Sequence, residues 1–226
     1  MKGSDILTRA RTALNDADAV RWTDAELIQW INDGCKFIVG LRPDAGSLTA
    51  VLTLVAGTRQ SVAGMAPPGL RLLDVIREEA TGNGVRLVDR EVLDAEVPGW
   101  HKATPGPVDC YVFDNRDPTT FYVFPPAVAG AQLEVMYVRA PVEISSADVS
   151  SATLTPPDVF LDSLLNYVLH RAKMKEGEGI DVQVSAGLRS LAEQLLTGKA
   201  SSDRAFSPDF NSPGARPAPG ALSGGV

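Results

Sequence analysis

A chain of 226 residues with 44% hydrophobic and 22% charged side chains has enough apolar material for one elaborate domain or two small ones. No stretch approaches the roughly 18 apolar residues of a membrane-spanning helix, and the first residues lack the apolar segment of a secretory signal. We therefore expect a globular protein that stays in the cytoplasm where it is made, with no membrane as a partner. Cys35 and Cys110 lie far apart without the spacing of a metal or redox motif, which favours buried free thiols.

The net charge of −7 is concentrated in the middle of the chain. Residues 46–153 hold 13 Asp and Glu side chains against 8 Lys and Arg, whereas the flanking segments are close to balance. Tight binding of nucleic acid by a basic patch needs clustered Lys and Arg that displace counterions, so this distribution argues against that mechanism. An acidic surface facing DNA would instead let the duplex slide past.

Two amphipathic helices are predicted at the start of the chain. Ser4 is a candidate cap for the first helix, and Asn15 begins the polar stretch that ends it. The second helix has a fuller start signal, because Thr23 and Glu26 have the spacing of a capping box. The apolar positions expected to face the core are Ile6, Leu7, Ala10 and Leu14 in the first helix, and Leu27, Trp30, Ile31, Ile38 and Leu41 in the second.

Three further residues define the second helix. Trp22 and Leu27 stand at the two positions of a hydrophobic staple, which fixes how the chain enters the helix. Gly34 lies between turns of the apolar stripe, where another backbone could approach closely. Pro43 ends the helix.

The middle of the chain alternates in polarity as β-strands do. Gly57 predicts the turn of a hairpin, and Asn83–Gly84 predicts a turn between two further strands. Val88 to Ala95 is interpreted as a short helix. The last strand should place Leu133, Val135 and Tyr137 on one face. The predicted strands are residues 48–55, 60–62, 72–76, 85–88, 111–113, 121–124 and 132–138.

An aromatic hairpin is the most informative of these strand pairs. Residues 111–113 and 121–124 are rich in aromatic and β-branched side chains, and residues 114–118 supply the Asp, Asn and Pro of a turn. A loop bounded by Pro and Gly, residues 98–101, precedes it and contains Trp100 and His101. The whole block reads as structural rather than catalytic.

The chain returns to helices after the strands. Thr155 is a candidate cap, and Pro156 occupies a first-turn position. We expect Leu165 to lie deep in the resulting core, and Gly198 to stop the last helix. The apolar faces are Phe160, Leu161, Leu164, Leu165, Val168, Leu169 and Ala172 in one helix, and Val184, Leu188, Leu191 and Leu195 in the last.

These elements predict an α+β fold with an extended C-terminal arm. Residues 1–45 and 154–199 would pack as a four-helix bundle. Residues 46–153 would form an inserted antiparallel β-sandwich or small barrel. Residues 200–226 consist mostly of Ala, Ser, Pro and Gly and lack the apolar content for a core of their own, so they are expected to be an extended arm.

No known catalytic, phosphate-binding or metal-binding motif is present in the sequence. His101 is expected to pack or to hydrogen-bond in its loop, and His170 is expected to be a partly exposed helix residue. Asp114 and Asp117 are a conceivable acid pair, but a turn role explains both. We therefore predict no enzymatic activity and no cofactor.

Four segments together resemble a known family. They are residues 21–34 (RWTDAELIQWINDG), residues 56–60 (AGTRQ), the block 98–126, and residues 163–172 (SLLNYVLHRA). In order and spacing these segments are similar to the head-to-tail adaptor, or connector, proteins of tailed bacteriophages, such as the adaptors of the tail tubular protein A type. The resemblance spans residues 4–197.

What the resemblance implies is a structural protein of the virion, located at the head–tail junction after synthesis in the host cytoplasm. Such proteins form a homo-oligomeric ring, commonly of twelve subunits, that binds the portal protein and receives tail tube or nozzle proteins. Double-stranded DNA leaves through the lumen without sequence-specific contacts. The alternatives are another tail-completion or tail-tube protein and, with less support, a tail-associated hydrolase.

A closed ring joins one surface patch to a different patch on the next subunit, so each chain needs two distinct contact surfaces. The arm is expected to leave its own subunit and to lie along the portal or an adjacent adaptor. The aromatic candidates outside the arm have a second interpretation, as core residues. The candidate partner-binding residues are Trp100, Phe121 and Tyr122 in and near the hairpin, Trp22 in the helices, and Phe206, Phe210 and Leu222 in the arm.

Overall fold

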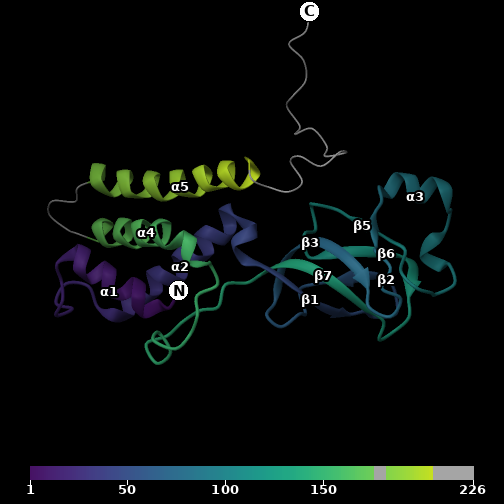
Figure 1. Cartoon of the computed structure of the whole chain (residues 1–226), viewed down its shortest axis with the longest axis horizontal. Coiled ribbons are helices and arrows are strands. Elements are labelled where there is room, and N and C mark those ends of the chain that lie inside the picture. Colours follow the sequence, from purple (N-terminus) through teal and green to yellow (C-terminus); the bar gives the residue numbers. More distant parts are fainter. Residues whose placement is uncertain (176–181, 206–226) are drawn as a thin grey trace, which may run out of the picture.

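The computed structural model describes residues 1–175 and 182–205 and has two parts (Figure 1). Four helices from the two ends of the chain lie together and form what we call the helical part. Two β-sheets and one short helix lie beside them and form the β part. The predicted α+β class is confirmed, with five α-helices and seven strands in the described residues. The candidates Phe206, Phe210 and Leu222 lie outside those residues.

The helical part is organised around one C-terminal helix. It contains α1 (Gly3–Leu14), α2 (Asp24–Leu41), α4 (Leu161–Met174) and α5 (Val182–Ala205). Helix α4 contacts each of the other three, so the beginning and end of the chain share one core, as predicted. Its fully buried members include Ile6, Leu27, Ile31, Ile38, Leu164 and Val168.

The start of α2 agrees with the sequence, and the start of α1 does not. Thr23 accepts a hydrogen bond from the backbone of Glu26, whose carboxylate accepts one from Thr23, so the capping box is confirmed. Helix α1 begins at Gly3 with Lys2 as its cap, and the predicted cap Ser4 is therefore wrong. Ser4 lies inside the first turn of the helix, where its backbone N–H bonds the carbonyl of Val149.

The apolar stripe of α2 also needs one correction. Leu41 was expected in the core but is exposed, because it lies in the last turn, where the chain leaves the helical part. Gly34 does mark a close approach, although by side chains rather than by backbone. A Cβ at Gly34 would lie 2.4 Å from Leu164 Cδ1 and 3.0 Å from Tyr167 Cδ1.

The two C-terminal helices differ from the prediction at their ends. Thr155 does not cap α4: a short 3₁₀ turn, η3 (Asp158–Phe160), precedes that helix, and the Thr155 hydroxyl accepts a bond from the Val142 N–H. Leu165 is only half-buried, and its neighbour Leu164 takes the deep position instead. Helix α5 continues through Gly198 to Ala205, so residues 200–205 are helical and not the start of an extended arm.

Helix α5 packs on α4 through a face that the sequence did not indicate. Ser185, Ala192 and Leu196 are its buried residues, and the Ser163 hydroxyl donates to the Ala192 carbonyl at 2.9 Å. Small side chains let the two helices come close. His170 is buried in the same contact and lies 2.8 Å from the Ser185 carbonyl, so the expectation of a partly exposed histidine is wrong.

Two sheets, rather than one closed barrel, make up the β part. The first contains β1 (Ser47–Thr53), β7 (Gln132–Arg139) and β3 (Gly69–Glu78), in that order. The second has the order β2 (Gly57–Ser61), β6 (Thr120–Ala127), β5 (Cys110–Phe113) and β4 (Arg86–Leu87). Both sheets contribute side chains to one core, which includes Leu72, Val75, Leu133, Val135 and Tyr137 from the first and Tyr111, Phe121 and Val123 from the second.

One predicted hairpin is wrong because the chain changes sheets at its turn. β1 pairs with β7 and β2 pairs with β6, so Gly57, with φ of +104°, lies on a crossing between sheets. The chain does turn back at Asn83–Gly84, with an antiparallel bridge between Arg77 and Gly84, but β4 then joins the other sheet and runs parallel to β5. The aromatic hairpin is confirmed, since β5 and β6 pair antiparallel in register from Cys110 opposite Phe124. The short helix is confirmed as α3 (Arg90–Glu96).

The two parts are joined by two neighbouring crossings of the chain. The first runs through η1 (Pro43–Gly46) into β1, and the second leaves from β7, with Ser47 opposite Val138. Arg42 secures this region, because its guanidinium donates to the Leu196 carbonyl of α5 at 3.0 Å and pairs with Asp44. The β part is therefore an insertion whose two connections emerge side by side.

Candidate functional site

A groove lies at the end of the β part. Its volume is about 790 Å³, and it lies between α3 and the turn that joins β5 to β6. Figure 1 shows α3 at the end of the β part that is farthest from the helical part. The groove is lined by acidic residues Asp89, Glu91, Asp94, Asp114 and Asp117, by Arg90 and Arg116, and by apolar side chains that include Tyr122.

Packing of an indole ring holds α3 against the hairpin. Trp100, in η2 (Trp100–Lys102), donates from Nε1 to Asp94 at 2.7 Å, and its ring meets those of Tyr122 and Phe124 edge-on. This hydrogen bond is the largest cause that lowers the pKa of Asp94, so the carboxylate stays ionised at the groove wall. His101 stacks on Trp100 and lies 2.9 Å from the Thr58 hydroxyl.

The structure places the predicted aromatic contact residues in different environments. Trp100 is 2% exposed and Phe121 is fully buried, so of their two interpretations the structure supports the core role within their own subunit. Trp22 is buried as well, with its Nε1 donating to the Ala172 carbonyl. Tyr122 is half-buried and lines the groove, which keeps it as a candidate contact residue.

The acid pair of the hairpin turn behaves as a structural element. Asp114 accepts the backbone N–H of Arg116 at 2.9 Å and forms an ion pair with its guanidinium. The Arg116 side chain is the main reason why the pKa of Asp114 falls to about 2. A general acid needs a raised pKa near neutrality, so Asp114 is unsuited to that role. The turn interpretation is further supported because the Asp114 carbonyl accepts the N–H of Asp117.

Other side chains that could be chemically reactive also have structural roles. Cys35 and Cys110 are free and buried, as predicted, and burial raises the pKa of the Cys35 thiol to about 12. His170 bonds Ser185 between α4 and α5. Within residues 1–175 and 182–205, no cluster of His, Cys, Asp and Glu has the arrangement of a metal site. No described helix combines the length and apolar character needed to cross a membrane.

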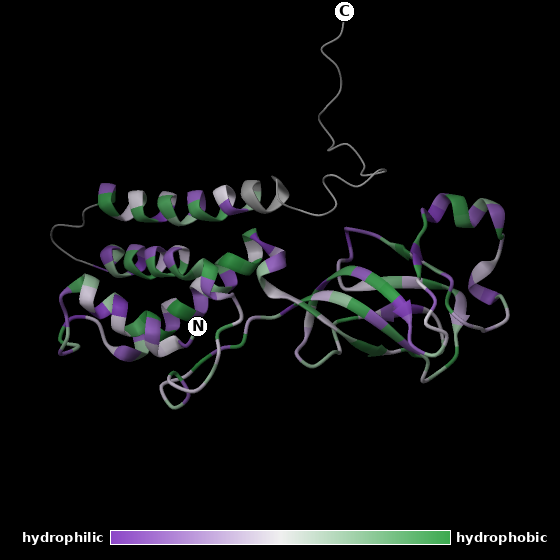
Figure 2. Cartoon of the chain, in the orientation of Figure 1, coloured by the Kyte–Doolittle hydropathy of each residue, from purple (hydrophilic) through white to green (hydrophobic). Residues whose placement is uncertain are grey.

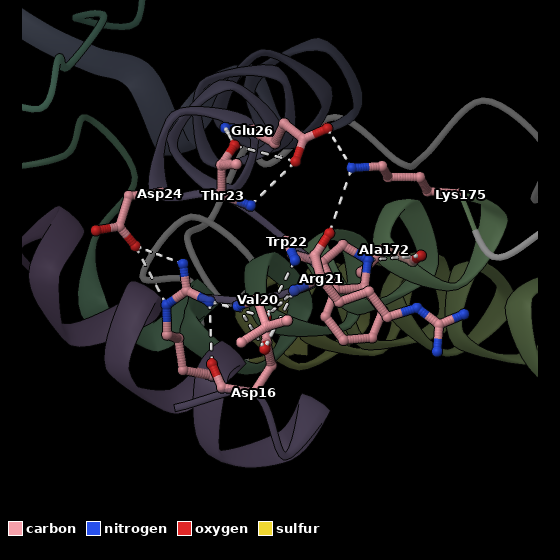
Figure 3. Close-up of polar contacts among 10 residues, drawn as sticks. Asp16, Val20, Arg21, Trp22, Thr23, Asp24, Glu26, Ala172 and Lys175 are labelled. Atoms are coloured by element: carbon pink, nitrogen blue, oxygen red, sulfur yellow. Dashed lines mark hydrogen bonds and ion pairs between the residues drawn. The ribbon is translucent and has the colours of Figure 1, made fainter. Parts of the chain in front are cut away.

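Sequence reasoning missed a polar cluster at the corner between α1 and α2 (Figure 3). The Asp16 carboxylate accepts backbone N–H groups from Val20, Arg21 and Trp22 at 2.9 to 3.3 Å. It also accepts the Arg11 guanidinium, and the bond from Trp22 is the largest cause that lowers the pKa of Asp16. A single carboxylate thus shapes the loop that presents Trp22, and its role depends on a folded loop that no local pattern reveals.

The same corner is tied to the end of α4. Lys175 donates to Glu26 at 2.5 Å and to the Arg21 carbonyl at 3.4 Å, as Figure 3 shows. The hydrogen bond from Lys175 is the main cause that lowers the pKa of Glu26 from 4.5 to about 2. With the Trp22 indole held by the Ala172 carbonyl, the corner fixes where α2 begins relative to α4.

This arrangement predicts how acid acts on the helical part. A carboxylate with a lowered pKa in the folded state adds stability at pH above its unfolded pKa, and that stability is lost as the pH falls towards the folded pKa. Replacing Glu26 by Gln should therefore reduce the pH dependence of stability between about pH 4.5 and 2. Urea midpoints measured across this range test it, with Glu91→Gln on exposed α3 as the control. An unchanged pH dependence in Glu26→Gln would contradict the prediction.

A second candidate surface lies on α5. Leu191 and Leu195, expected in the core, are 42% and 39% exposed, because the α4 contact uses a different face of the helix. Beside them, a Cβ added at Gly187 or Gly198 would meet no atom within 4 Å. Figure 2 shows hydrophobic residues recurring along the coloured part of this helix. The apolar pattern in the sequence was therefore real but belongs mainly to the surface, which suits a contact with another molecule.

The site as a whole defines a class of protein. The titratable side chains described above take part in helix caps, turns and ion pairs. The distinctive surfaces are an acidic groove and an apolar helix face. This combination is typical of a structural subunit. Residues 1–217 match the family model described as SU10 adaptor protein, and the chain belongs to this family. No curated protein matches the chain. Family membership makes the chain a bacteriophage adaptor protein, which is a structural, virion-associated role, and agrees with the resemblance to head-to-tail adaptors.

Proposed function

We propose that this protein forms a homo-oligomeric ring that joins the phage portal to the tail and surrounds the path by which DNA leaves the head. Membership of the adaptor family over residues 1–217 is the observation that carries the proposal. A ring of identical subunits uses heterologous contacts, in which one patch meets a different patch on the next subunit. The apolar face of α5 is a candidate for one of these patches, and the acidic groove of the β part is a candidate for the DNA path.

The apolar face of α5 is the candidate for contact with the portal or with the next subunit. Leu191 and Leu195 project from it, and the glycines beside them leave room for a neighbouring backbone. Glycine costs about 1 kcal/mol relative to alanine inside a helix, so two glycines in α5 are unfavourable for the isolated helix. A close contact between α5 and a partner would compensate for this cost.

The acidic β part is the candidate lining of the DNA path. Residues 46–153 carry five more acidic than basic side chains, and the groove walls contain five carboxylates against two guanidinium groups. Carboxylates repel phosphates, so DNA passing such a surface would meet no binding site that delays it. Double-stranded DNA would then pass through the ring without being bound as a sequence-specific ligand.

The purified chain tests the proposal in the presence and absence of portal rings from the same phage. Size-exclusion chromatography with light scattering should show an oligomer alone or on the portal, with twelve subunits as the resemblance suggests. Electron microscopy of that complex should show a ring whose lumen faces the acidic side of the β part. A chain that stays monomeric and does not bind portal would contradict the proposal, as would a lumen lined mainly by Lys and Arg.

Charge added to the α5 face should weaken assembly without weakening the fold. The double variant Leu191→Glu/Leu195→Glu places two carboxylates in the proposed contact, where burying an unpaired charge is costly. Capture by portal, or the mass of the oligomer, should fall at least about tenfold in apparent affinity, while the melting temperature stays close to that of the parent. Ser190→Glu/Gln194→Glu adds the same charge at exposed positions of the same helix and serves as the control. Equal assembly of the two variants would remove α5 from the interface.

A further inference from the structure

One strand edge of the β part lacks the protection that the other edges have. Exposed edges usually carry charges, bulges or very short strands that prevent pairing with another chain. β3 is charged and shifts register against β7 three times, β2 carries Arg59 and one register shift, and β4 has only two residues. β1 differs: all seven of its residues pair with β7 without a shift, and none is charged or proline.

The backbone groups on the open side of β1 can be identified. The N–H and C=O of Leu54 bond towards Ala131 and Gly130, that is, towards β7. The backbone N–H and C=O groups of adjacent residues point to opposite edges of a strand. Val55 accordingly points away from β7, and the Gln60 side chain satisfies both its N–H and its C=O at 2.9 and 2.8 Å. Ser47, Thr49, Val51 and Thr53 share the direction of Val55, and no described strand lies on that side of them.

The side chains along β1 also indicate a missing neighbour. Leu48 and Ala50 face the core, opposite Tyr137 and Val135, yet both are only half-buried. On the other face, Val51 is 47% exposed. An added strand would cover both faces at this edge, since cross-strand neighbours are the main contacts of a sheet residue.

The C-terminal sequence beyond the described residues has a pattern that fits this edge. From residue 209 onward, every proline has an odd number: Pro213, Pro217 and Pro219. In an extended strand, residues of equal parity direct their backbone groups to the same side, so all donors at even positions would be available on one side. Proline is compatible with a sheet only at an edge where its missing N–H faces outwards. The edge of the segment with the even-numbered residues can therefore pair with a strand, whereas the edge with the prolines cannot.

We propose that residues 212–222 of a second copy of this chain add as a strand to the open edge of β1. The even-numbered residues, Arg216 and Ala218 among them, bond Thr49, Val51 and Thr53. Opposed residues have side chains on the same face of the sheet, so Pro217 and Pro219 fall on the core side and cover Leu48 and Ala50. The new outer edge is closed by prolines, which stops further strand addition.

The choice of a second copy rests on the proposed function. An edge that receives a strand and an arm that supplies one are two unlike surfaces on the same chain, as a heterologous ring contact requires. The arm begins after Ala205, which leaves six residues, spanning at most about 20 Å, before residue 212. A reach this short excludes subunits beyond the adjacent one, and the mixing experiment below separates the adjacent subunit from the arm's own.

Two proline substitutions that differ only in parity test the proposal. Ala218→Pro removes an N–H that faces β1, whereas Ala221→Pro removes one that faces away. Amide hydrogen exchange of the assembled full-length protein should show Thr49, Val51 and Thr53 protected. Ala218→Pro should reduce that protection at least about tenfold, and Ala221→Pro should leave it unchanged. Equal effects of the two variants, or exposed β1 amides in the parent assembly, would overturn the proposal.

A mixing experiment tests the second copy. Isotope-labelled Ala218→Pro chains, whose own arm is impaired, are mixed with unlabelled parent chains. Protection of the labelled β1 amides should return, and its failure to return while the parent remains protected would mean that the arm folds on its own subunit and would overturn the proposal. The proposed function is read separately from portal capture, so a chain that binds portal with an open β1 edge refutes only this inference.

Discussion

Replacing Leu164 by alanine is expected to lower the free energy of unfolding of the helical part by about 2–5 kcal/mol. Leu164 is fully buried on α4, the helix that contacts all three others, and its removal leaves a cavity in addition to the lost burial. Urea unfolding followed by circular dichroism measures the effect. Leu165→Ala is the matched control, because the same side chain one position later is only half-buried and should cost clearly less. Equal losses in the two variants would contradict the assignment of the core face.

A double-mutant cycle can show which contact Leu164 makes. Gly34→Ala alone should destabilise by about 1–3 kcal/mol, since the added Cβ would lie 2.4 Å from Leu164 Cδ1. In the Leu164→Ala background that clash disappears, so the second substitution should cost little or should fill the cavity. Strict additivity of the two changes would mean that α2 and α4 do not meet at Gly34.

The second large effect is expected in the β part. Trp100→Ala should destabilise it by about 3–5 kcal/mol, because the buried indole joins α3 to the aromatic hairpin. Trp100→Phe separates the two contributions of the ring: it keeps most of the packing but loses the Nε1 bond to Asp94. The loss for Trp100→Phe should be the smaller of the two. Guanidinium unfolding of both variants, monitored by near-ultraviolet circular dichroism of the remaining aromatics, decides the order.

An unperturbed hairpin in Trp100→Ala would show that α3 is not needed for its stability. In that case the groove would be a surface feature of independent elements rather than one packed unit. Restoration of the missing aromatic contacts by Trp100→Phe would support the packed unit. The measured pKa of Asp94 gives a second readout, because losing the Nε1 bond should raise it.

The parts of the fold that local chemistry determines could be predicted from the sequence. Thr23 and Glu26 form their capping box within one helical turn, and the turn residues from Asp114 to Pro118 close a hairpin between adjacent strands. The alternation of β7 placed Leu133, Val135 and Tyr137 on the buried face. In each case the partners lie within a few residues, so the pattern contains the necessary information.

Strand pairing over long separations could not be predicted. β1 and β2 are adjacent in sequence and look like a hairpin, yet their partners are about 85 and 65 residues away and lie in different sheets. Periodicity also could not decide between Leu164 and Leu165, because both fall within the apolar arc of α4. On α5, Val184, Leu191 and Leu195 are outside, whereas the small residues Ser185 and Ala192 are inside together with Leu196.

The candidate site was predicted least well, for a related reason. Aromatic residues serve cores and interfaces equally, so the sequence could not show that Phe121 and Trp100 would be buried while Tyr122 would remain partly exposed. Asp16 gave no signal, because its three backbone donors come together only after the loop has folded. The arm candidates Phe206, Phe210 and Leu222 remain predictions.

The position of the two crossings between the helical part and the β part has a mechanical consequence. Both leave from the same end of the β1–β7 pair, where Ser47 lies opposite Val138. Because both crossings attach to the helical part, a pull that separates the two parts draws the ends of β1 and β7 in the same direction, and the hydrogen bonds between these two strands carry little of the load. The load passes instead to the ladder between β7 and β3, so a subunit under axial tension would keep β1 and β7 together as one unit.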